Sequence, residues 1–248
     1  ERLVDWHTHG RALTQPSALF TGPVDTERFR PASAAERAAM RSELGVPRDA
    51  PFVGTIANLN PMKGIEWFIR AAGLIHRQRP DAWFLISGAT YPNHEHYRLM
   101  LEREIVATGV PRERFVVRHD PPDRHYPSLD VKLITSLPAS EGRTTTGPEA
   151  MACAIAVVAT DVGAVAEVVE HGETGLVVAP EDAQALARAT LALLDDADLR
   201  ARLGATGRER ALERYALEPS ARSMIDSFTA ARRFHAARRR RSRGRPAR

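Results

Sequence analysis

Short apolar runs alternate along the chain with longer stretches in which apolar residues recur every three or four positions. The short runs are mostly rich in Val, Ile, Leu and Phe, and they cover residues 52–57, 83–87, 115–118, 131–135, 156–159 and 175–178. Continuous apolar runs of this length are typical of strands buried on both faces of a parallel sheet. The pattern therefore predicts one sheet built from these six segments.

Helices are predicted between these strands, and one of them has clearly marked ends. Ser33-Ala-Ala-Glu36 forms a capping box at its start. Gly45 and then Pro47 end that helix after Leu44. Further helices are predicted over residues 64–78, 97–108 and 182–194.

Alternating strands and helices with connections of this length require parallel neighbours and right-handed crossovers. The predicted fold class is therefore α/β, a doubly wound parallel sheet of the Rossmann-like kind. Ligands of such sheets bind beyond the carboxyl ends of the strands, so candidate site residues are sought there.

A last helix is predicted near the carboxyl terminus, because apolar residues there share one face. They lie four, seven, eight and eleven positions after the first of them, a spacing that places them along one side of a helix. This apolar stripe consists of Leu217, Ala221, Met224, Ile225 and Phe228. Such a stripe must pack on something. We expect it to be exposed in this chain or covered by a partner chain.

The positive charge of the chain is concentrated at its carboxyl end. The formal net charge is +4, but nine of the 35 basic residues are arginines within residues 231–248, where there is no acid. The rest of the chain holds 26 bases against 31 acids, a net charge of −5, which excludes a specific nucleic-acid-binding face on the body. The tail is predicted to be a solvated, disordered end, with salt-sensitive attraction to anionic lipid head groups or nucleic acid as the alternative.

Three further features narrow the class of protein. The longest apolar runs fall well short of the roughly 20 residues that a membrane-spanning helix needs. The stretch after Glu1 is interrupted by charged and polar residues, whereas a secretory signal needs a continuous apolar centre. We therefore expect a cytoplasmic location, with loose membrane association as the alternative. Cys153 is the single cysteine, which excludes a disulfide within the chain and is typical of a small buried side chain.

The first candidate site follows the strand predicted at residues 52–57. Gly54-Thr-Ile-Ala-Asn-Leu-Asn-Pro-Met-Lys-Gly64 is a strand, a loop and a lysine at the start of a helix. Lys63 would add a full positive charge to the partial charge and free N–H groups of that helix terminus, which suits a phosphate. The alternative interpretation of Lys63 is a solvated surface lysine.

The second candidate site, Glu141-Gly-Arg-Thr-Thr-Thr-Gly-Pro-Glu149, follows the strand predicted at residues 131–135. Pro148 pre-sets the first helical turn, so we expect Glu149 in that turn with Gly147 as the cap. Small residues and two glycines allow the backbone to approach a ligand, and a fixed carboxylate accepts hydrogen bonds from neighbouring sugar hydroxyls. The alternative role of Glu149 is stabilisation of the helix dipole alone, worth roughly 0.3–1 kcal/mol.

A third cluster, Thr160-Asp-Val-Gly-Ala-Val-Ala-Glu167, again joins a strand to a helix. By itself it is typical of an ordinary loop that joins a strand to a helix. The order of the three clusters carries more information, because Pro23-Val-Asp-Thr-Glu-Arg-Phe-Arg-Pro31 precedes them and Glu170-His-Gly-Glu-Thr-Gly-Leu-Val-Val178 follows. Together these segments resemble glycosyltransferase family 4.

The resemblance runs from about Gly22 to Tyr215. Its most specific part is a pair of glutamates, Glu141 and Glu149, separated by seven residues and followed by Ala-Met-Ala. In that family the fold is GT-B, two Rossmann-like domains that face each other across a cleft, and the carboxyl-terminal domain holds the nucleotide-sugar. This chain resembles that second domain.

The resemblance also implies roles for particular residues. By position, Lys63 would hold the donor diphosphate, Glu149 the ribose hydroxyls and Glu141 the transferred sugar, with Lys63 and Glu141 as the catalytic residues. The implied substrate-binding set is Asn58, Lys63, Glu141, Gly142, Arg143, Thr144, Thr145, Gly147 and Glu149. A preformed cation and a helix N-terminus stabilise the leaving diphosphate, so no metal and no cofactor are expected.

The sequence departs from the family pattern at several positions. Asn58 stands where the first loop usually carries an arginine, and Arg143-Thr144 replaces an aromatic residue and a glycine. Ala154 and Ala156 replace a glycine and a proline. Loss of the arginine removes one phosphate contact, which Lys63 or Arg143 would have to replace.

The resemblance sets the expected domain boundaries. Residues 1–27 would be a linker or a remnant of the amino-terminal domain, and residues 28–215 the nucleotide-sugar-binding domain. Residues 216–235 would form a crossover helix and residues 236–248 the basic disordered tail. The family's amino-terminal domain, which binds the acceptor, is expected to be missing before Glu1.

The predicted function is that of the donor-binding domain of a hexosyltransferase-type glycosyltransferase, retaining and metal-independent. Its expected partners are a UDP- or GDP-sugar, with an ADP-sugar not excluded by the sequence, and a glycan, lipid-linked or small-molecule acceptor. The alternative is a non-catalytic half-enzyme that binds a nucleotide-sugar or a partner chain, and a nucleotide-sugar epimerase is a third hypothesis. Asp5-Trp-His-Thr-His9 favours a fourth, a metal-dependent hydrolase, which needs further ligands from His94, His96, His119 or His125.

Overall fold

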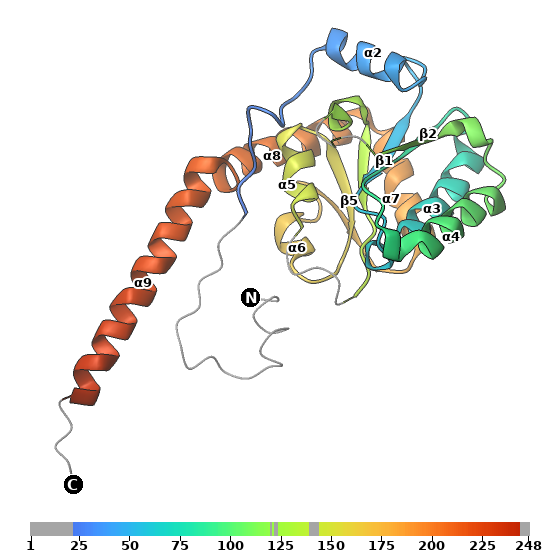
Figure 1. Cartoon of the computed structure of the whole chain (residues 1–248). Coiled ribbons are helices and arrows are strands. Elements are labelled where there is room, and N and C mark those ends of the chain that lie inside the picture. Colours follow the sequence, from blue (N-terminus) through green and yellow to red (C-terminus); the bar gives the residue numbers. More distant parts are fainter. Residues whose placement is uncertain (1–21, 120, 122–123, 139–143, 244–248) are drawn as a thin grey trace.

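The centre of the molecule is an open sheet of six parallel strands in the order β3-β2-β1-β4-β5-β6 (Figure 1). The computed structural model describes residues 22–119, 121, 124–138 and 144–243. The strands are β1 (Phe52–Ile56), β2 (Trp83–Ser87), β3 (Phe115–Arg118), β4 (Val131–Ile134), β5 (Ala156–Thr160) and β6 (Gly175–Val178). All six predicted strands are confirmed, and so is the doubly wound, Rossmann-like fold class.

Helices follow the strands and cover both faces of the sheet (Figure 1). They are α2 (Ala34–Glu43), α3 (Ile65–Gln78), α4 (Glu95–Ala107), α5 (Thr146–Ala152), α6 (Val165–Val168), α7 (Ala183–Asp195), α8 (Ala197–Arg214) and α9 (Leu217–Arg243). Short 3-10 turns include η1 (Pro61–Lys63) and η5 (Tyr126–Ser128). The helices predicted after the capping box and over residues 64–78, 97–108 and 182–194 correspond to α2, α3, α4 and α7.

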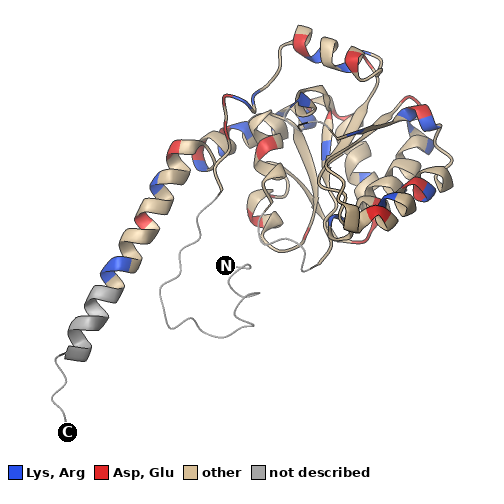
Figure 2. Cartoon of the chain, viewed as in Figure 1, with Lys and Arg blue, Asp and Glu red and all other residues tan. Residues whose placement is uncertain are grey.

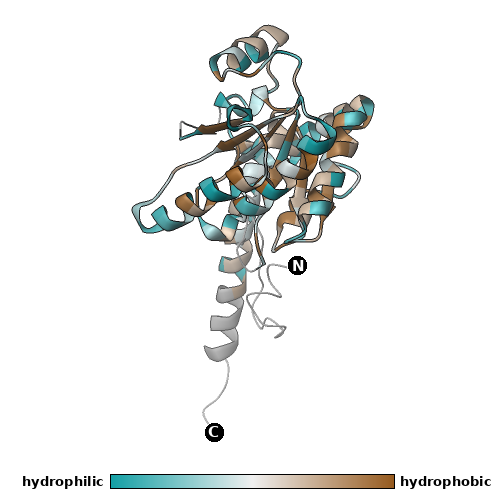
Figure 3. Cartoon of the chain, turned by 90° about the vertical axis from the view of Figure 1, so that its right-hand side faces the viewer, coloured by the Kyte–Doolittle hydropathy of each residue, from teal (hydrophilic) through white to brown (hydrophobic). Residues whose placement is uncertain are grey.

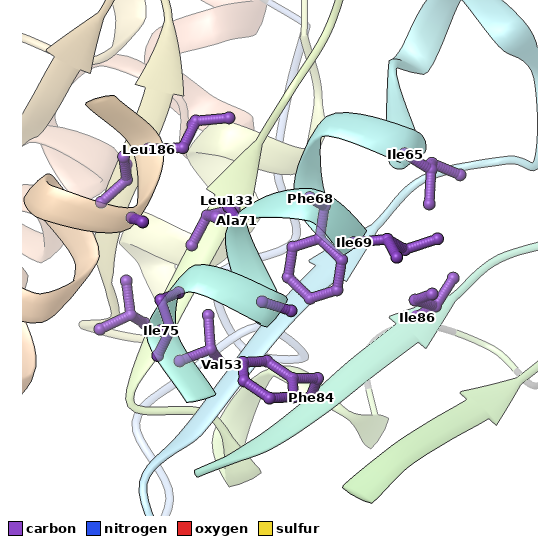
Figure 4. Packing of buried hydrophobic residues seen from close by; sticks show 14 of the residues in the cluster. Val53, Ile65, Phe68, Ile69, Ala71, Ile75, Phe84, Ile86, Leu133 and Leu186 are labelled. Carbon is purple, nitrogen blue, oxygen red and sulfur yellow. The ribbon is translucent and has the colours of Figure 1, made fainter. Parts of the chain in front are cut away.

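The sheet separates two apolar cores. On one face α3, α4 and α7 pack on the strands, and Phe68 of α3 meets Phe84 of β2 edge to face with ring centroids 6.4 Å apart (Figure 4). On the other face α5 and α6 pack with the turn at Tyr126 and Leu129. Each fully buried Phe, Leu or Ile side chain contributes roughly 1.5–3 kcal/mol, so these two layers supply much of the stability. Figure 3 shows the apolar strands inside and hydrophilic residues on the outer helical surfaces.

Helix α2 is tied to the edge of the sheet opposite the strands' carboxyl ends. The predicted capping box is confirmed, because Glu36 N–H donates to Ser33 Oγ and Ser33 N–H donates to Glu36 Oε2. Arg41, whose side chain is 3% exposed, donates to Asp130 at 2.8 Å. Asp130 also accepts from the backbone N–H of Phe52 at 2.8 Å, so one carboxylate joins α2 to the start of β1.

Helix α8 was not predicted from the sequence. Its buried residues are Leu203, Gly204, Gly207 and Ala211, so the packed face is made mainly of small side chains and shows no apolar period. A Cβ on Gly204 would lie 2.3 Å from the carbonyl oxygen of Ala154, and one on Gly207 would lie 3.4 Å from the Met151 side chain. The two glycines therefore allow α8 to approach the chain around α5 closely.

Helix α9 leaves the body and extends away from it (Figure 1). It was expected to end at residue 235, but it continues to Arg243. Val24, which the expected boundaries assign to the linker, pairs with Ala216 just before this helix. Leu217, Ile225 and Phe228 are 59%, 64% and 66% exposed, which agrees with the expectation of an exposed stripe.

Charged side chains of both signs are interspersed over the helices of the body (Figure 2). Among the residues that the structure describes, we find no helix with the length and apolar content needed to cross a membrane.

Candidate functional site

A small cavity lies beyond the carboxyl ends of β1 and β4, with a volume of about 140 Å³. These two neighbouring strands lead to connections on opposite sides of the sheet, which makes this point the topological switch of the fold. Open α/β sheets bind their ligands at such a crevice. The lining residues are Thr55, Ile56, Ala57, Asn58, Lys63, Lys132, Ile134, Thr135, Ser136, Thr144, Thr145 and Thr146.

The backbone of Lys63 is fixed between β1 and the loop that follows β4. Thr135 Oγ1 donates a hydrogen bond to the carbonyl oxygen of Lys63 at 3.0 Å, and Leu137 N–H donates to the carbonyl of Met62 at 3.0 Å. Gly64 follows with a φ of 57°, and a Cβ there would lie 2.2 Å from the carbonyl oxygen of Thr135. Only glycine fits this left-handed position. The turn at Gly64 places the half-buried side chain of Lys63 at the cavity, and α3 begins directly after it.

Three threonines before and within α5 form another wall of the cavity. Thr144 is 5% exposed, and its hydroxyl lies 3.2 Å from the Thr146 hydroxyl. Thr145, not Gly147, is the cap of α5, because its carbonyl accepts from the N–H of Glu149 at 3.2 Å. The expectation of a Gly147 cap was therefore wrong: the helix starts earlier and Gly147 lies buried inside its first turn.

Glu149 lies in the first turn of α5 as predicted, and a buried tyrosine orients its carboxylate. The hydroxyl of Tyr126 donates to Glu149 Oε2 at 2.8 Å, and the carbonyl of Thr146 lies 3.3 Å from the same hydroxyl. Burial raises the pKa of Tyr126 well above its ordinary value, and the charge of Glu149 raises it further. Tyr126 therefore stays a neutral donor at any physiological pH and holds one oxygen of Glu149.

Two side chains of this region were missed in the sequence. Tyr126 stands in a turn, within a stretch with no strand or helix pattern, and nothing local links it to Glu149. Lys132 lies inside β4 between Gly54 and Val157 of the neighbouring strands, where an apolar residue is expected. It is 1% exposed and its Nζ donates to the carbonyl of Leu133 at 3.0 Å. A lysine inside an apolar run was the signal that could have identified it.

The predicted binding set is brought together in part. Asn58, Lys63, Thr144 and Thr145 line the cavity, with Asn58 exposed, and the helix that carries Gly147 and Glu149 begins at its wall. Glu141, Gly142 and Arg143 lie outside the described residues, and so does the segment Asp5-Trp-His-Thr-His9.

The described residues contain no group of three or more His, Cys, Asp or Glu side chains with the arrangement of a metal site. Asp196 and Asp198 have the Asp-x-Asp spacing that is used for metals elsewhere. Here the Asp196 side chain accepts from the backbone N–H of Leu199 at 2.8 Å and caps α8. His125, one of the histidines considered as a ligand, is buried, and its Nδ1 lies 2.8 Å from the hydroxyl of Ser87.

A doubly wound parallel sheet with a lysine-bearing, hydroxyl-rich crevice at its switch point defines a Rossmann-like ligand-binding domain. Comparison with known families identifies its relatives. The family described as "Glycosyl transferases group 1" matches residues 36–210, which is more than half of the chain. The chain belongs to this family.

Curated relatives extend beyond this chain. The lipopolysaccharide core biosynthesis mannosyltransferase LpsB of Rhizobium meliloti (strain 1021) is 31% identical over 223 residues, which cover 88% of this chain and 62% of the relative. A GDP-mannose-dependent monoacylated alpha-(1-6)-phosphatidylinositol monomannoside mannosyltransferase of Corynebacterium glutamicum is 34% identical over 194 residues, 75% of this chain and 49% of the relative. The chain thus spans about half to three fifths of the length of these relatives.

Solved structures give the same fold. HepE of Anabaena in complex with UDP-glucose superposes with a TM-score of 0.82 at 22% identity, over 92% of this chain and 61% of that one. The carboxyl-terminal domain of LpcC, a glycosyl transferase group 1 protein of Francisella tularensis, gives a TM-score of 0.69 at 26% identity. That match covers 78% of this chain and 99% of the Francisella domain.

Proposed function

We propose that this chain is the carboxyl-terminal, donor-binding domain of a GT-B glycosyltransferase of family 4. With an acceptor-binding domain it transfers a hexosyl group from a nucleotide-sugar to an acceptor, with retained configuration and without a metal. The observation that carries the proposal is the cavity at the switch point, where Lys63 and a cluster of hydroxyl groups meet. Membership of the group 1 glycosyltransferases supports it.

The proposed chemistry follows from the charges that develop in the reaction. The bond between the sugar carbon and the diphosphate oxygen breaks, and its electron pair stays on the diphosphate. The acceptor hydroxyl forms the new bond to that carbon, and its proton passes to the departing diphosphate. Lys63, held rigidly through its backbone beside the start of α3, stabilises the growing negative charge without having to reorganise. Glu141 is proposed to bind the transferred sugar.

Glu149 is proposed to bind the ribose hydroxyls. One of its carboxylate oxygens accepts from Tyr126, which fixes the rotation of the carboxylate about its axis. A carboxylate in one orientation accepts hydrogen bonds from two adjacent hydroxyls with less loss of side-chain entropy. The backbone around Gly142, together with Arg143, Thr144, Thr145 and Gly147, is proposed to complete the donor site.

The domain organisation supports the same proposal. The match to almost all of an isolated carboxyl-terminal domain agrees with a carboxyl-terminal position for this chain. We keep residues 28–215 as the approximate donor-binding domain, with a cytoplasmic location. The exposed stripe of α9 is proposed to contact an amino-terminal domain or a partner chain.

The donor is proposed to be a UDP- or GDP-sugar. The Corynebacterium relative is named as GDP-mannose-dependent, and the Anabaena structure holds UDP-glucose. The acceptor is proposed to be a glycan, a lipid-linked sugar or a small polar molecule, because the names of the relatives include acceptors of these kinds.

Calorimetric titration of the full chain with UDP- and GDP-sugars tests the proposal. Glu149→Ala and Lys63→Ala should each weaken donor binding about tenfold or more, because a charge-assisted hydrogen bond is worth roughly 1.5–3 kcal/mol. Glu113→Ala is a matched control, since this exposed carboxylate lies in the turn before β3, at the other end of the sheet. A folded chain that binds no nucleotide-sugar would refute the donor-site assignment.

The second candidate function is a non-catalytic module that binds a nucleotide-sugar or a partner chain. The observation that favours it is the exposed apolar stripe of α9, a surface that is typical of contact with another chain. Measured sugar transfer to any acceptor by the full chain, alone or with a supplied amino-terminal domain, would exclude this alternative.

A further inference from the structure

A pocket with a volume of about 300 Å³ lies at the amino ends of β1 and β4, at the opposite end of the sheet from the cavity that contains Lys63. It is bounded by α2, the loop before β1 and the adjoining ends of α3, α7 and α8. We call it the arginine pocket. Five of the ten described residues that line it are arginines, namely Arg37, Arg41, Arg48, Arg79 and Arg200. Its volume is close to the lower end of the range for small-molecule sites.

Two of these arginines, both on α2, are held in place by the fold. Arg41 donates to Asp130 at 2.8 Å and to the carbonyl oxygen of Arg48 at 2.7 Å. Arg37 donates to the other oxygen of Asp130 at 2.6 Å and to the carbonyl oxygen of Leu129 at 2.8 Å. A ligand would therefore meet guanidinium groups that are already in position, so that little side-chain entropy remains to be lost on binding.

The arginine pocket contains more positive than negative charge. Arg79 donates to Asp81 and Asp195 at 3.2 and 2.9 Å, so neighbouring carboxylates compensate its charge. Among the described lining residues, the other four arginines face two carboxylates, Asp49 and Asp130, which leaves an excess of two positive charges. A bound dianion would balance this excess.

The positive charges in this pocket act on one another. Burial lowers the pKa of Arg37 below its ordinary value, and Asp130 opposes this change. The charges of Arg41 and Arg200 lower the same pKa further. An anion between these guanidinium groups would reduce their mutual repulsion.

Two arginines are placed to contact a ligand from the edge of the pocket. Arg48 is exposed in the loop before β1. Arg200 is half-buried on α8, and its Nη1 donates to the carbonyl oxygen of Leu194 at 3.2 Å. Because a guanidinium has five N–H groups, Arg200 has further donors for a ligand.

We propose that the arginine pocket binds a phosphate group, either as free phosphate or on a small molecule. A guanidinium presents paired N–H donors that match two oxygens of one phosphate, and a phosphate dianion supplies the charge that balances the pocket. A long polyanion is disfavoured, because the pocket is small and residues 1–230 hold 26 bases against 31 acids. The inference does not depend on the proposed function, since none of the described residues that line this pocket also lines the cavity with Lys63.

Arginine footprinting of the wild-type full chain tests the inference directly. Phenylglyoxal reacts with accessible guanidinium groups, and mass spectrometry locates the modified residues. Inorganic phosphate and glucose 1-phosphate should each slow the modification of Arg48 and Arg200, while the exposed Arg103 on α4 reacts as before. Stronger protection by the sugar phosphate would identify a phosphorylated molecule as the ligand, and equal protection would identify free phosphate. Protection no greater than that given by sodium chloride at the same ionic strength would overturn the inference.

Substitution of Arg48 gives an independent readout. Arg48→Gln removes an exposed guanidinium and keeps the backbone carbonyl that accepts from Arg41, so its stability to urea should match that of the wild type. The Kd for phosphate, measured from the protection of Arg200, should rise about tenfold or more, because a hydrogen bond between charged groups is lost. Arg103→Gln is the matched control and should leave this Kd unchanged. An unchanged Kd in Arg48→Gln would contradict the inference.

Lys63→Met separates the arginine pocket from the proposed donor site. It should leave the protection of Arg200 by phosphate unchanged, because Lys63 lines the other cavity. Protection that is lost in Lys63→Met and kept in Arg48→Gln would assign the phosphate to that cavity and overturn the inference. A chain that binds phosphate at Arg48 and Arg200 but binds no nucleotide-sugar would refute only the donor-site proposal.

Discussion

At the scale of single residues, the arrangement around Glu149 depends on one buried hydroxyl. Tyr126 is 0% exposed and contacts Phe29 edge to face at 5.7 Å, so its ring cannot move away from α5 without disturbing the core. Its hydroxyl donates to the carboxylate that is proposed to bind ribose. The packing of the tyrosine ring therefore contributes to the orientation of Glu149.

Tyr126→Phe should show how much the orientation of the Glu149 carboxylate, as distinct from its charge, contributes to donor binding. The variant keeps Glu149 and the ring but removes the hydrogen bond, so we expect a stability loss of about 1 kcal/mol and donor binding weaker by about threefold to tenfold. The loss of binding should be smaller for a 2′,3′-dideoxy nucleotide, which lacks the hydroxyls. Thr190→Val is the control, since it also removes a buried hydroxyl, which donates to the carbonyl of Leu186 within α7 and does not contact Glu149. Equal losses of binding in the two variants would contradict this role of Tyr126.

Ala154 is a residue under backbone strain. It has a φ of 57° directly after α5, where Ile155 N–H donates to the carbonyl of Ala150 and Ala154 N–H donates to Met151, the pattern of a Schellman cap. Glycine would adopt this conformation without strain.

Ala154→Gly should stabilise the chain. The left-handed conformation costs a non-glycine residue roughly 1–2 kcal/mol, of which the larger backbone entropy of unfolded glycine cancels a part, so we expect a net gain of about 0.5–1 kcal/mol. Urea denaturation measures it. A destabilised variant would show that the methyl group of Ala154 contributes packing that outweighs the strain.

At the scale of elements, the start of α3 and the loop after β4 are built as one unit. Gly64 begins α3, its neighbour Lys63 accepts from Thr135, and Tyr97 of α4 accepts from the N–H of Ile65. The position of Lys63 therefore depends on three elements that are distant in the sequence.

Gly64→Ala should disturb this unit strongly. The added Cβ would lie 2.2 Å from the carbonyl oxygen of Thr135, in addition to the strain of a φ of 57°, so we expect a loss of about 2–4 kcal/mol. Gly45→Ala is the matched control, because Gly45 has a φ of 73° with nothing within 4 Å of the added atom. That control should lose about 1 kcal/mol, the strain alone. Similar losses in the two variants would contradict the role assigned to the Thr135 contact.

At the scale of the whole molecule, the body and α9 differ in how far their apolar side chains are exposed to solvent. The sheet and its helices bury two cores, whereas Leu217, Ile225 and Phe228 of α9 are exposed. An exposed stripe on a long helix is typical of a surface that contacts another domain or chain.

Replacing Ile225 and Phe228 together by serine should leave the body unaffected. The two side chains are 64% and 66% exposed, so the free energy of unfolding should change by less than about 0.5 kcal/mol. Self-association in sedimentation velocity experiments should decrease relative to the wild type. A large loss of stability would show that the stripe packs on the body in solution.

Much of this architecture could be predicted from the sequence, because buried parallel strands have a strong local pattern. Helix α8 could not, since three of the four buried residues on its packed face are glycine or alanine, and its approach to Ala154 is a tertiary property. In the site, Lys63 and Glu149 stand in recognisable motifs. Tyr126 meets Glu149 only in the folded chain, from 23 positions away in the sequence, and no local spacing reveals that contact.

We propose that the cavity between β1 and β4 holds the diphosphate of a nucleotide donor. A crystal structure of the full chain with GDP or UDP tests it most directly. Phosphate oxygens should lie within hydrogen-bonding distance of Lys63 Nζ and of the cavity's hydroxyl groups, with the ribose beside Glu149. A nucleotide bound at any other surface of the chain, with this cavity left empty, would contradict the account.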